Sequence, residues 1–210
     1  MRIRFDRGPI GGGTCFDQPL RLIRADGPAD VPAALAALDA ARAAGHWLAG
    51  YASYELGYAL EPKLAARMPA RRRLPLMCFG VYEAPHAHAA EGSTCAWVGA
   101  ERPGRAGHGP ASRSGKAGLE AITPRWNYEC YAEAFQQVNR NIGKGDIYQA
   151  NLTFPIDAEA YGTAEELYAV LQAKQAVGHG VLVQQDGLPD LLSRSPELFF
   201  RTDAAGMIET

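Results

Sequence analysis

Strand-like and helix-like segments alternate irregularly along this chain, and this pattern limits its fold more than any other feature. Short apolar runs separated by turn residues occupy residues 180–184, 190–193 and 197–201, which is typical of antiparallel strands. No strand–helix–strand unit recurs at a regular spacing, as a doubly wound parallel sheet requires. The pattern therefore predicts an α+β fold, and 210 residues with 47% hydrophobic content can bury a sizeable core.

The first half of the chain predicts a strand and a helix followed by two more strands. Residues 19–25 alternate as a strand does, and Asp30 lies where it can cap a helix that ends at Gly45. Further strands are expected at residues 47–54 and 76–84, where aromatic, β-branched and small residues gather.

The second half predicts two helices with a strand between them. Asn127 can cap the first helix, which glycines end near Gly145. The strand is expected at residues 147–156. Thr163 and Glu166 have the spacing of a capping box at the start of the second helix.

A change of composition divides the two halves. From about residue 87 to residue 123 the chain is rich in Gly, Ala, Ser, Pro and Arg, with one short strand expected at residues 94–98. Such a composition is typical of an exposed connection. We therefore expect residues 1–122 to form an N-terminal domain and residues 123–210 to begin a second domain.

The polar residues of segment 147–156 form the first candidate site. If the segment is a strand, Gln149 and Asn151 lie on one face and the apolar residues on the other. A half-exposed strand of any antiparallel sheet has the same alternation. If the polar face is instead buried, a ligand or a partner chain must supply hydrogen bonds to its amides.

The sequence around Glu197 is the second candidate. Pro196 disfavours a helical Ser195, so the chain should enter Glu197 in an extended conformation, and apolar residues follow. A carboxyl group in such surroundings is hard to ionise, as a general acid at neutral pH requires. The alternative is a glutamate in water, or one paired with Arg194 or Arg201.

Segment 49–62 is the third candidate, because Tyr51, Tyr54 and Glu55 could line a pocket for a small molecule such as an amino acid. The alternative is a packed aromatic cluster whose hydroxyls contact water.

Several classes of function receive no support. The net charge of −2 leaves no basic excess for nucleic acid, and the dense basic run, 71–73, fits a solvated loop. The four cysteines and five histidines have no metal-ligand spacing, so we expect no metal site here. No apolar stretch is long enough to span a membrane, and the N-terminus lacks a signal-peptide core, so we expect a cytoplasmic protein.

Four motifs resemble the family of chorismate-utilising enzymes, which includes aminodeoxychorismate synthase component I, anthranilate synthase component I and the isochorismate synthases. IGKGDIYQANLTF (142–154) is similar to the family's helix end and Tyr-Gln-x-Asn-Leu strand, and SRSPELFF (193–200) matches its Ser-Pro-Glu strand. GYASYELGYALEP (50–62) and FDQPLRLIRA (16–25) further resemble the aminodeoxychorismate synthase branch.

The resemblance implies a four-layer α/β/β/α sandwich, represented by its N-terminal portion only. In the family a Pro-Ile-Lys-Gly-Thr segment follows the Ser-Pro-Glu strand after a short hairpin, and this chain stops at Thr210, where that segment is due. We therefore expect a fragment that is inactive by itself. The magnesium ligands of the family are likewise expected outside this chain.

The resemblance also implies a reaction. The missing lysine attacks chorismate at C2, the C4 hydroxyl leaves, and ammonia from a glutamine amidotransferase subunit enters at C4. Glu197 would act as acid or base near that lysine, with Gln149, Asn151 and Ser195 lining the substrate site. Two alternatives stay open: anthranilate synthase component I, which places nitrogen at C2, and a non-catalytic module that docks the glutaminase or senses an amino acid.

Overall fold

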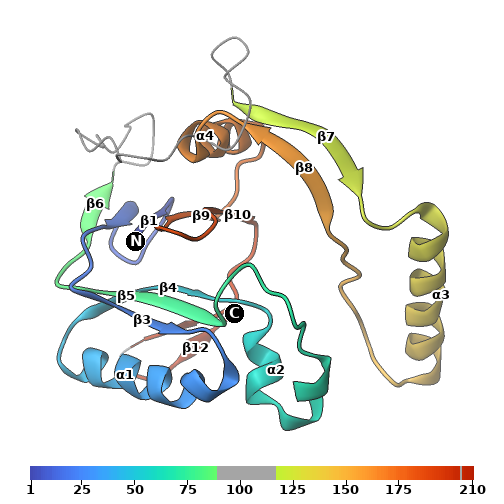
Figure 1. Ribbon diagram of the computed structural model, residues 1–210, viewed down its shortest axis with the longest axis horizontal. Coiled ribbons are helices and arrows are strands. Elements are labelled where there is room, and N and C mark those ends of the chain that lie inside the picture. The colour runs from blue at the N-terminus through green and yellow to red at the C-terminus, as the bar shows by residue number, and fades with distance from the viewer. Residues whose placement is uncertain (89–116, 204) are drawn as a thin grey trace. The chain divides into compact units, whose positions relative to one another are not determined.

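The computed structural model describes residues 1–88, 117–203 and 205–210, which form two compact units (Figure 1). Unit 1 comprises Met1–Arg102 with Leu171–Thr210, and unit 2 comprises Pro103–Val170. The boundary expected at residue 122 falls within a strand of unit 2 and stays a prediction. The strand expected at residues 94–98 lies outside the described residues.

Unit 1 contains most of the regular structure. Its strands are β1 (Arg2–Phe5), β2 (Gly13–Phe16), β3 (Arg21–Ala25), β4 (Trp47–Ala52), β5 (Met77–Tyr82), β6 (His86–His88), β9 (His179–Gln184), β10 (Leu191–Ser195), β11 (Arg201–Thr202) and β12 (Ile208–Glu209). Its helices are η1 (Pro28–Asp30), α1 (Val31–Ala43), α2 (Leu56–Leu60) and η2 (Pro62–Arg67). Helix α4 (Ala164–Lys174) contributes residues to both units.

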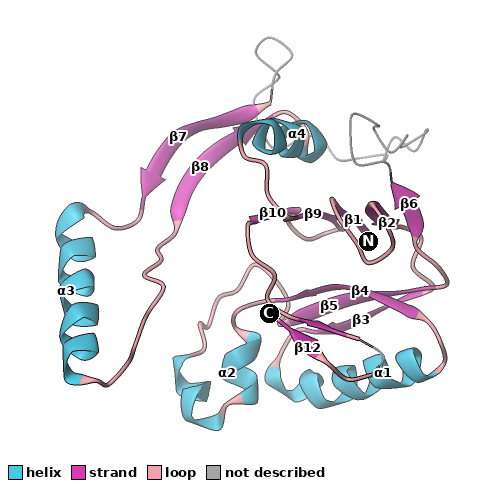
Figure 2. Cartoon of the chain, turned by 180° about the vertical axis from the view of Figure 1, so that it is seen from behind, coloured by secondary structure: helices cyan, strands magenta, loops and turns pink. Residues whose placement is uncertain are grey.

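Two antiparallel sheets pack face to face in unit 1. One has the strand order β10-β9-β1-β2-β6 and the other the order β3-β5-β4. Ile3, Phe16 and Val183 of the larger sheet pack against Ala49 and Tyr82 of the smaller one. Helix α1 covers the opposite face of the smaller sheet (Figure 2). These layers confirm the α+β class, and they account for three of the four layers expected from the resemblance.

Helix α1 begins differently from the expectation. Asp30 has helical backbone angles, and its side chain makes no N-cap hydrogen bond within α1. Its carboxylate instead accepts hydrogen bonds from the backbone N–H groups of Asp26 and Gly27, at 3.2 and 2.9 Å. The extra turn η1 precedes α1, so Asp30 stabilises the turn that leads into the helix. Gly45 ends this region with a φ of 84°, as expected for a glycine stop.

Unit 2 contains the strands β7 (Gly118–Pro124) and β8 (Ile156–Tyr161), which pair antiparallel, and helix α3 (Tyr128–Lys144). The caps are confirmed. Asn127 accepts a hydrogen bond from the N–H of Cys130, and Gly145 ends α3 in the left-handed conformation. Thr163 and Glu166 exchange the two hydrogen bonds of a capping box at α4.

The strand expected at residues 147–156 is wrong except for its last residue. Residues 147–155 are irregular, and β8 begins only at Ile156. A strand needs a paired neighbour, and β7 ends opposite Ile156 at Pro124. Phe154 stacks on Trp126 at 5.4 Å and meets the edge of Tyr131 at 6.1 Å. The irregular segment is therefore held beside α3 by aromatic contacts.

A second expected strand, at residues 197–201, is also shorter than predicted. Residues 196–200 are irregular, and pairing resumes only in the two-residue strands β11 and β12. Among the helices of the described ranges, none combines the length and the apolar character needed to cross a membrane.

Candidate functional site

The turn after β10 carries the central residue of the predicted site. Strand β10 ends at Ser195, and Pro196 offers no N–H to continue the pairing. The Ser195 hydroxyl donates to the backbone carbonyl of Glu197 at 2.9 Å and accepts from its N–H at 3.3 Å. Both bonds close a tight turn, so Ser195 shapes the backbone that presents Glu197.

The Glu197 side chain lies in an environment that differs from the expectation. It is exposed, at a bend rather than in a strand. Phe199 and Phe200 contact each other at 5.1 Å and are 86% and 53% exposed. The apolar enclosure that was expected to make this carboxyl hard to ionise is therefore absent from the described residues. Its role as acid or base stays a prediction.

The two arginines considered as partners of Glu197 bind other carboxylates. Arg194 donates to Asp6, and Arg201 donates to Glu209. Arg194 is the more informative of the two, because its side chain is only 8% exposed. Sequence reasoning did not identify Asp6 as its partner, since the two residues are separated by 188 positions.

Gln149 and Asn151 lie in the irregular segment of unit 2, and both are exposed. The two-faced strand that would have aligned them does not form. Glu197 and Ser195 belong to unit 1, so the four predicted substrate-site residues are divided between the two compact units.

Tyr51, Tyr54 and Glu55 have three different environments. Tyr51 is half-buried, and its hydroxyl donates to Oε1 of Gln185 at 3.1 Å. Burial raises the pKa of Tyr51 above its ordinary value. Tyr54 is 84% exposed and meets the ring of Tyr58 edge-on at 5.8 Å. Glu55 is half-buried at the start of α2.

The side chain of Gln185 connects β4 to the hairpin of β9 and β10. The sequence did not predict this role. Gln185 is 3% exposed, accepts from Tyr51 and donates through Nε2 to the carbonyl of Pro189 at 2.8 Å. A buried amide with both ends bonded holds a loop in place. No local pattern in the sequence marks this role, because Tyr51 and Gln185 are 134 positions apart.

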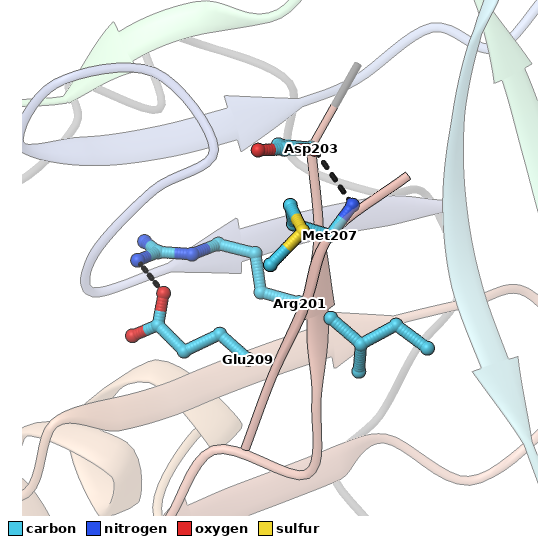
Figure 3. Close-up of a pocket in the computed structure, with 5 residues that line it drawn as sticks. Arg201, Asp203, Met207 and Glu209 are labelled. Atoms are coloured by element: carbon cyan, nitrogen blue, oxygen red, sulfur yellow. Dashed lines mark hydrogen bonds and ion pairs between the residues drawn. The ribbon is translucent and has the colours of Figure 1, made fainter. Parts of the chain in front are cut away.

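A hollow of about 230 Å³ lies on the hairpin of β11 and β12 (Figure 3). Its polar groups bind one another: Arg201 pairs with Glu209 at 2.5 Å, and Asp203 accepts from the N–H of Met207 at 2.9 Å. Ligand sites usually occupy 300–1,000 Å³ and direct free polar groups inward. The hollow is therefore a feature of the hairpin rather than a substrate site.

The described residues supply no metal centre, since no three His, Cys, Asp or Glu side chains among them gather in a way that could hold an ion. These residues alone therefore do not fit the magnesium ion that the resemblance implies.

Comparison with known proteins gives one family. Residues 16–210 match the family model described as chorismate binding enzyme. The match includes every candidate residue considered above. No solved structure matches the chain.

Proposed function

Because this chain belongs to the family of chorismate-binding enzymes, we propose that its protein aminates chorismate at C4 with glutamine-derived ammonia. The product is 4-amino-4-deoxychorismate, a precursor of 4-aminobenzoate and folate. The match over residues 16–210 carries the chorismate-utilising assignment. The choice of C4 is supported by the two motifs at residues 16–25 and 50–62.

These two motifs lie close together in unit 1. Residues 16–25 form the end of β2 and the edge strand β3, and residues 50–62 run from β4 into α2. Strands β3 and β4 both pair with β5. One strand of each motif, β3 and β4, therefore belongs to the same small sheet.

The proposed reaction has two balanced steps. A lysine amine attacks C2 of chorismate, the C1=C2 and C5=C6 double bonds move to C1=C6 and C4=C5, and the C4 hydroxyl leaves as water with the proton that the amine gives up. Ammonia then attacks C4, both double bonds move back, and the lysine leaves C2 as the free amine with the proton that ammonia gives up. Glu197 is assigned to protonate the leaving hydroxyl or to assist the lysine. An exposed carboxylate on a tight turn is accessible to groups outside the described residues.

No residue of the described ranges is assigned as the attacking lysine or as a magnesium ligand, and a glutamine amidotransferase subunit is proposed as the source of ammonia. Magnesium would neutralise substrate carboxylate charge when bound. No step is derived through the ion, because the described residues contain no group of ligands for it.

Product analysis tests the proposed function directly. The intact gene product would be incubated with chorismate, magnesium and an ammonium salt, and the products separated by chromatography. Accumulation of 4-amino-4-deoxychorismate supports the proposal. Anthranilate with pyruvate would instead identify anthranilate synthase chemistry, and unchanged chorismate would favour a non-catalytic module.

Glu197→Gln tests the catalytic assignment in the same protein. This change keeps the size of the side chain and removes its acid and base capacity, so turnover should fall by roughly several hundredfold. Glu83→Gln is the matched control, because Glu83 is an exposed glutamate of unit 1 just after β5. If turnover of the Glu197 variant stays within a factor of about two of wild type, the carboxylate has no catalytic role and is a structural group.

A further inference from the structure

The ion pair of Asp6 and Arg194 is withdrawn from water, unlike the surface pairs of the chain. Nη1 of Arg194 lies 2.5 Å from Oδ2 of Asp6, and the two side chains are 8% and 12% exposed. By comparison, the paired side chains of Arg125 and Asp157 in unit 2 are 58% and 59% exposed. Removing one member of a pair as enclosed as the first leaves an uncompensated charge.

The ion pair of Asp6 and Arg194 passes over β9, the strand that lies between β10 and β1 in the sheet. Arg194 on β10 is directly opposite Gly180 on β9. On the other side of β9, the N–H of Asp6 donates to the carbonyl of Gly180 at 2.9 Å. Neighbouring strands lie about 4.8 Å apart, so the side chains span roughly 10 Å between their backbones.

Gly180 makes this crossing possible. Residues directly opposite each other on paired strands direct their side chains to the same face of the sheet. At the central position glycine has no side chain, so no side chain at this position of β9 stands between Asp6 and Arg194. A larger residue at position 180 would project between Asp6 and Arg194.

Arg194 has a further anchor. Its Nη2 donates to the carbonyl of Gln175 at 2.6 Å, in the connection between α4 and β9. The guanidinium thus binds the end of β1 and this connection at once, with the fixed geometry that arginine provides. The next residue, Ser195, begins the turn that its hydroxyl closes around Glu197.

We propose that Arg194 is a positioning residue, which together with Asp6 holds the Ser195–Pro196–Glu197 turn in the orientation needed for catalysis. This inference rests on the proposed function, in which Glu197 is the acid or base. The turn has no strand partner beyond Ser195. Its orientation is therefore set by the anchored residue that precedes it.

The test separates positioning from simple stabilisation. In the intact protein, Asp6→Leu with Arg194→Met replaces the ion pair by apolar side chains, an exchange that often leaves stability unchanged or improved. If the pair positions the turn, kcat should fall about 10- to 100-fold while KM changes less than about twofold. Amide hydrogen exchange in a peptide covering residues 193–198 should become at least about tenfold faster.

The matched control is Arg125→Met with Asp157→Leu, which removes an exposed pair in unit 2 and should leave both measurements unchanged. If the Asp6 and Arg194 double variant does not fold, Arg194→Lys replaces it. A lysine has no planar fork with which to hold Asp6 and Gln175 together, so the same two effects should appear more weakly.

Wild-type kcat or wild-type amide exchange in the folded double variant overturns the inference. Failure of the proposed function can be distinguished from this outcome, because the wild-type protein would then form another product or leave chorismate unchanged. If another product forms, its kcat serves equally well in the test. If chorismate is not consumed, Glu197 has no reaction to be positioned for, and the inference is overturned with the function.

Discussion

Gly80 lies beneath the ring of Tyr82, and replacing it with alanine tests the packing between the two sheets of unit 1. A Cβ atom at position 80 would lie 2.4 Å from both Cζ and Oη of Tyr82. The ring cannot easily move away, because Tyr82 is 1% exposed and its centroid is 5.2 Å from that of Phe16. Gly80→Ala should therefore force the core apart.

The expected loss is about 2 kcal/mol in the free energy of unfolding. Overpacking a core costs about 1–3 kcal/mol, and the overlap at Gly80 exceeds roughly 1 Å, which places it near the upper end. The alanine also lowers the conformational entropy of the unfolded chain, which offsets about 0.5–1 kcal/mol of this loss in stability. For a chain of this length, 2 kcal/mol corresponds to a fall in Tm of about 4–8 °C.

The assay is urea unfolding followed by tryptophan fluorescence, since the ring of Trp47, which is 37% exposed, has its centroid 6.2 Å from that of the buried Phe16. Gly80→Ala would also be measured in a Tyr82→Leu background. Without the Tyr82 ring, Gly80→Ala should lose most of its destabilising effect. The coupling energy between the two substitutions should then approach about 2 kcal/mol.

Gly57→Ala is the control for this experiment. Gly57 lies in α2, and no atom would come within 4 Å of an added Cβ. The same substitution should stabilise the helix by about 0.5–1 kcal/mol. An unchanged stability of Gly80→Ala, or an equal loss with and without the Tyr82 ring, would refute the packing argument.

Two further predictions concern pH and helix capping. Burial raises the pKa of the Cys78 thiol above its ordinary 9.0 and that of the Tyr82 phenol above 10.0. The unfolded chain releases these protons first, so the contribution of these two groups to the unfolding free energy should be constant below about pH 8 and should be lost as pH rises from their ordinary pKa values through the folded-state ones. Urea unfolding under reducing conditions checks this, and Cys78→Ala should flatten the first part of the fall. Thr163→Ala should cost about 1 kcal/mol, because the Thr163 hydroxyl accepts from the N–H of Glu166. Thr163→Ser should retain most of this stability in the same assay, and equal stability of the alanine variant would contradict the capping role.

The sequence by itself determined the features that depend on near neighbours. The cap of α3 joins Asn127 to Cys130, and the capping box of α4 joins Thr163 to Glu166. Each spans three positions, so local preference decides the structure. The antiparallel strands and the α+β class follow from the same kind of information, since alternation and turn residues are also local. The motifs pointed to the chorismate-binding family in the same way, and the family match confirms that membership.

Only the tertiary structure decided features that need a partner far along the chain. The strand expected at residues 147–156 lacked a paired neighbour before Ile156, although its alternation was regular. Glu197 was expected among buried aromatic residues, but Phe199 and Phe200 have no described layer over them and remain exposed. Arg194 binds Asp6 across β9, although the two residues are 188 positions apart in the sequence. Strand pairing, burial and cross-strand ion pairs depend on which segments the fold brings together, and alternation within one segment does not specify them.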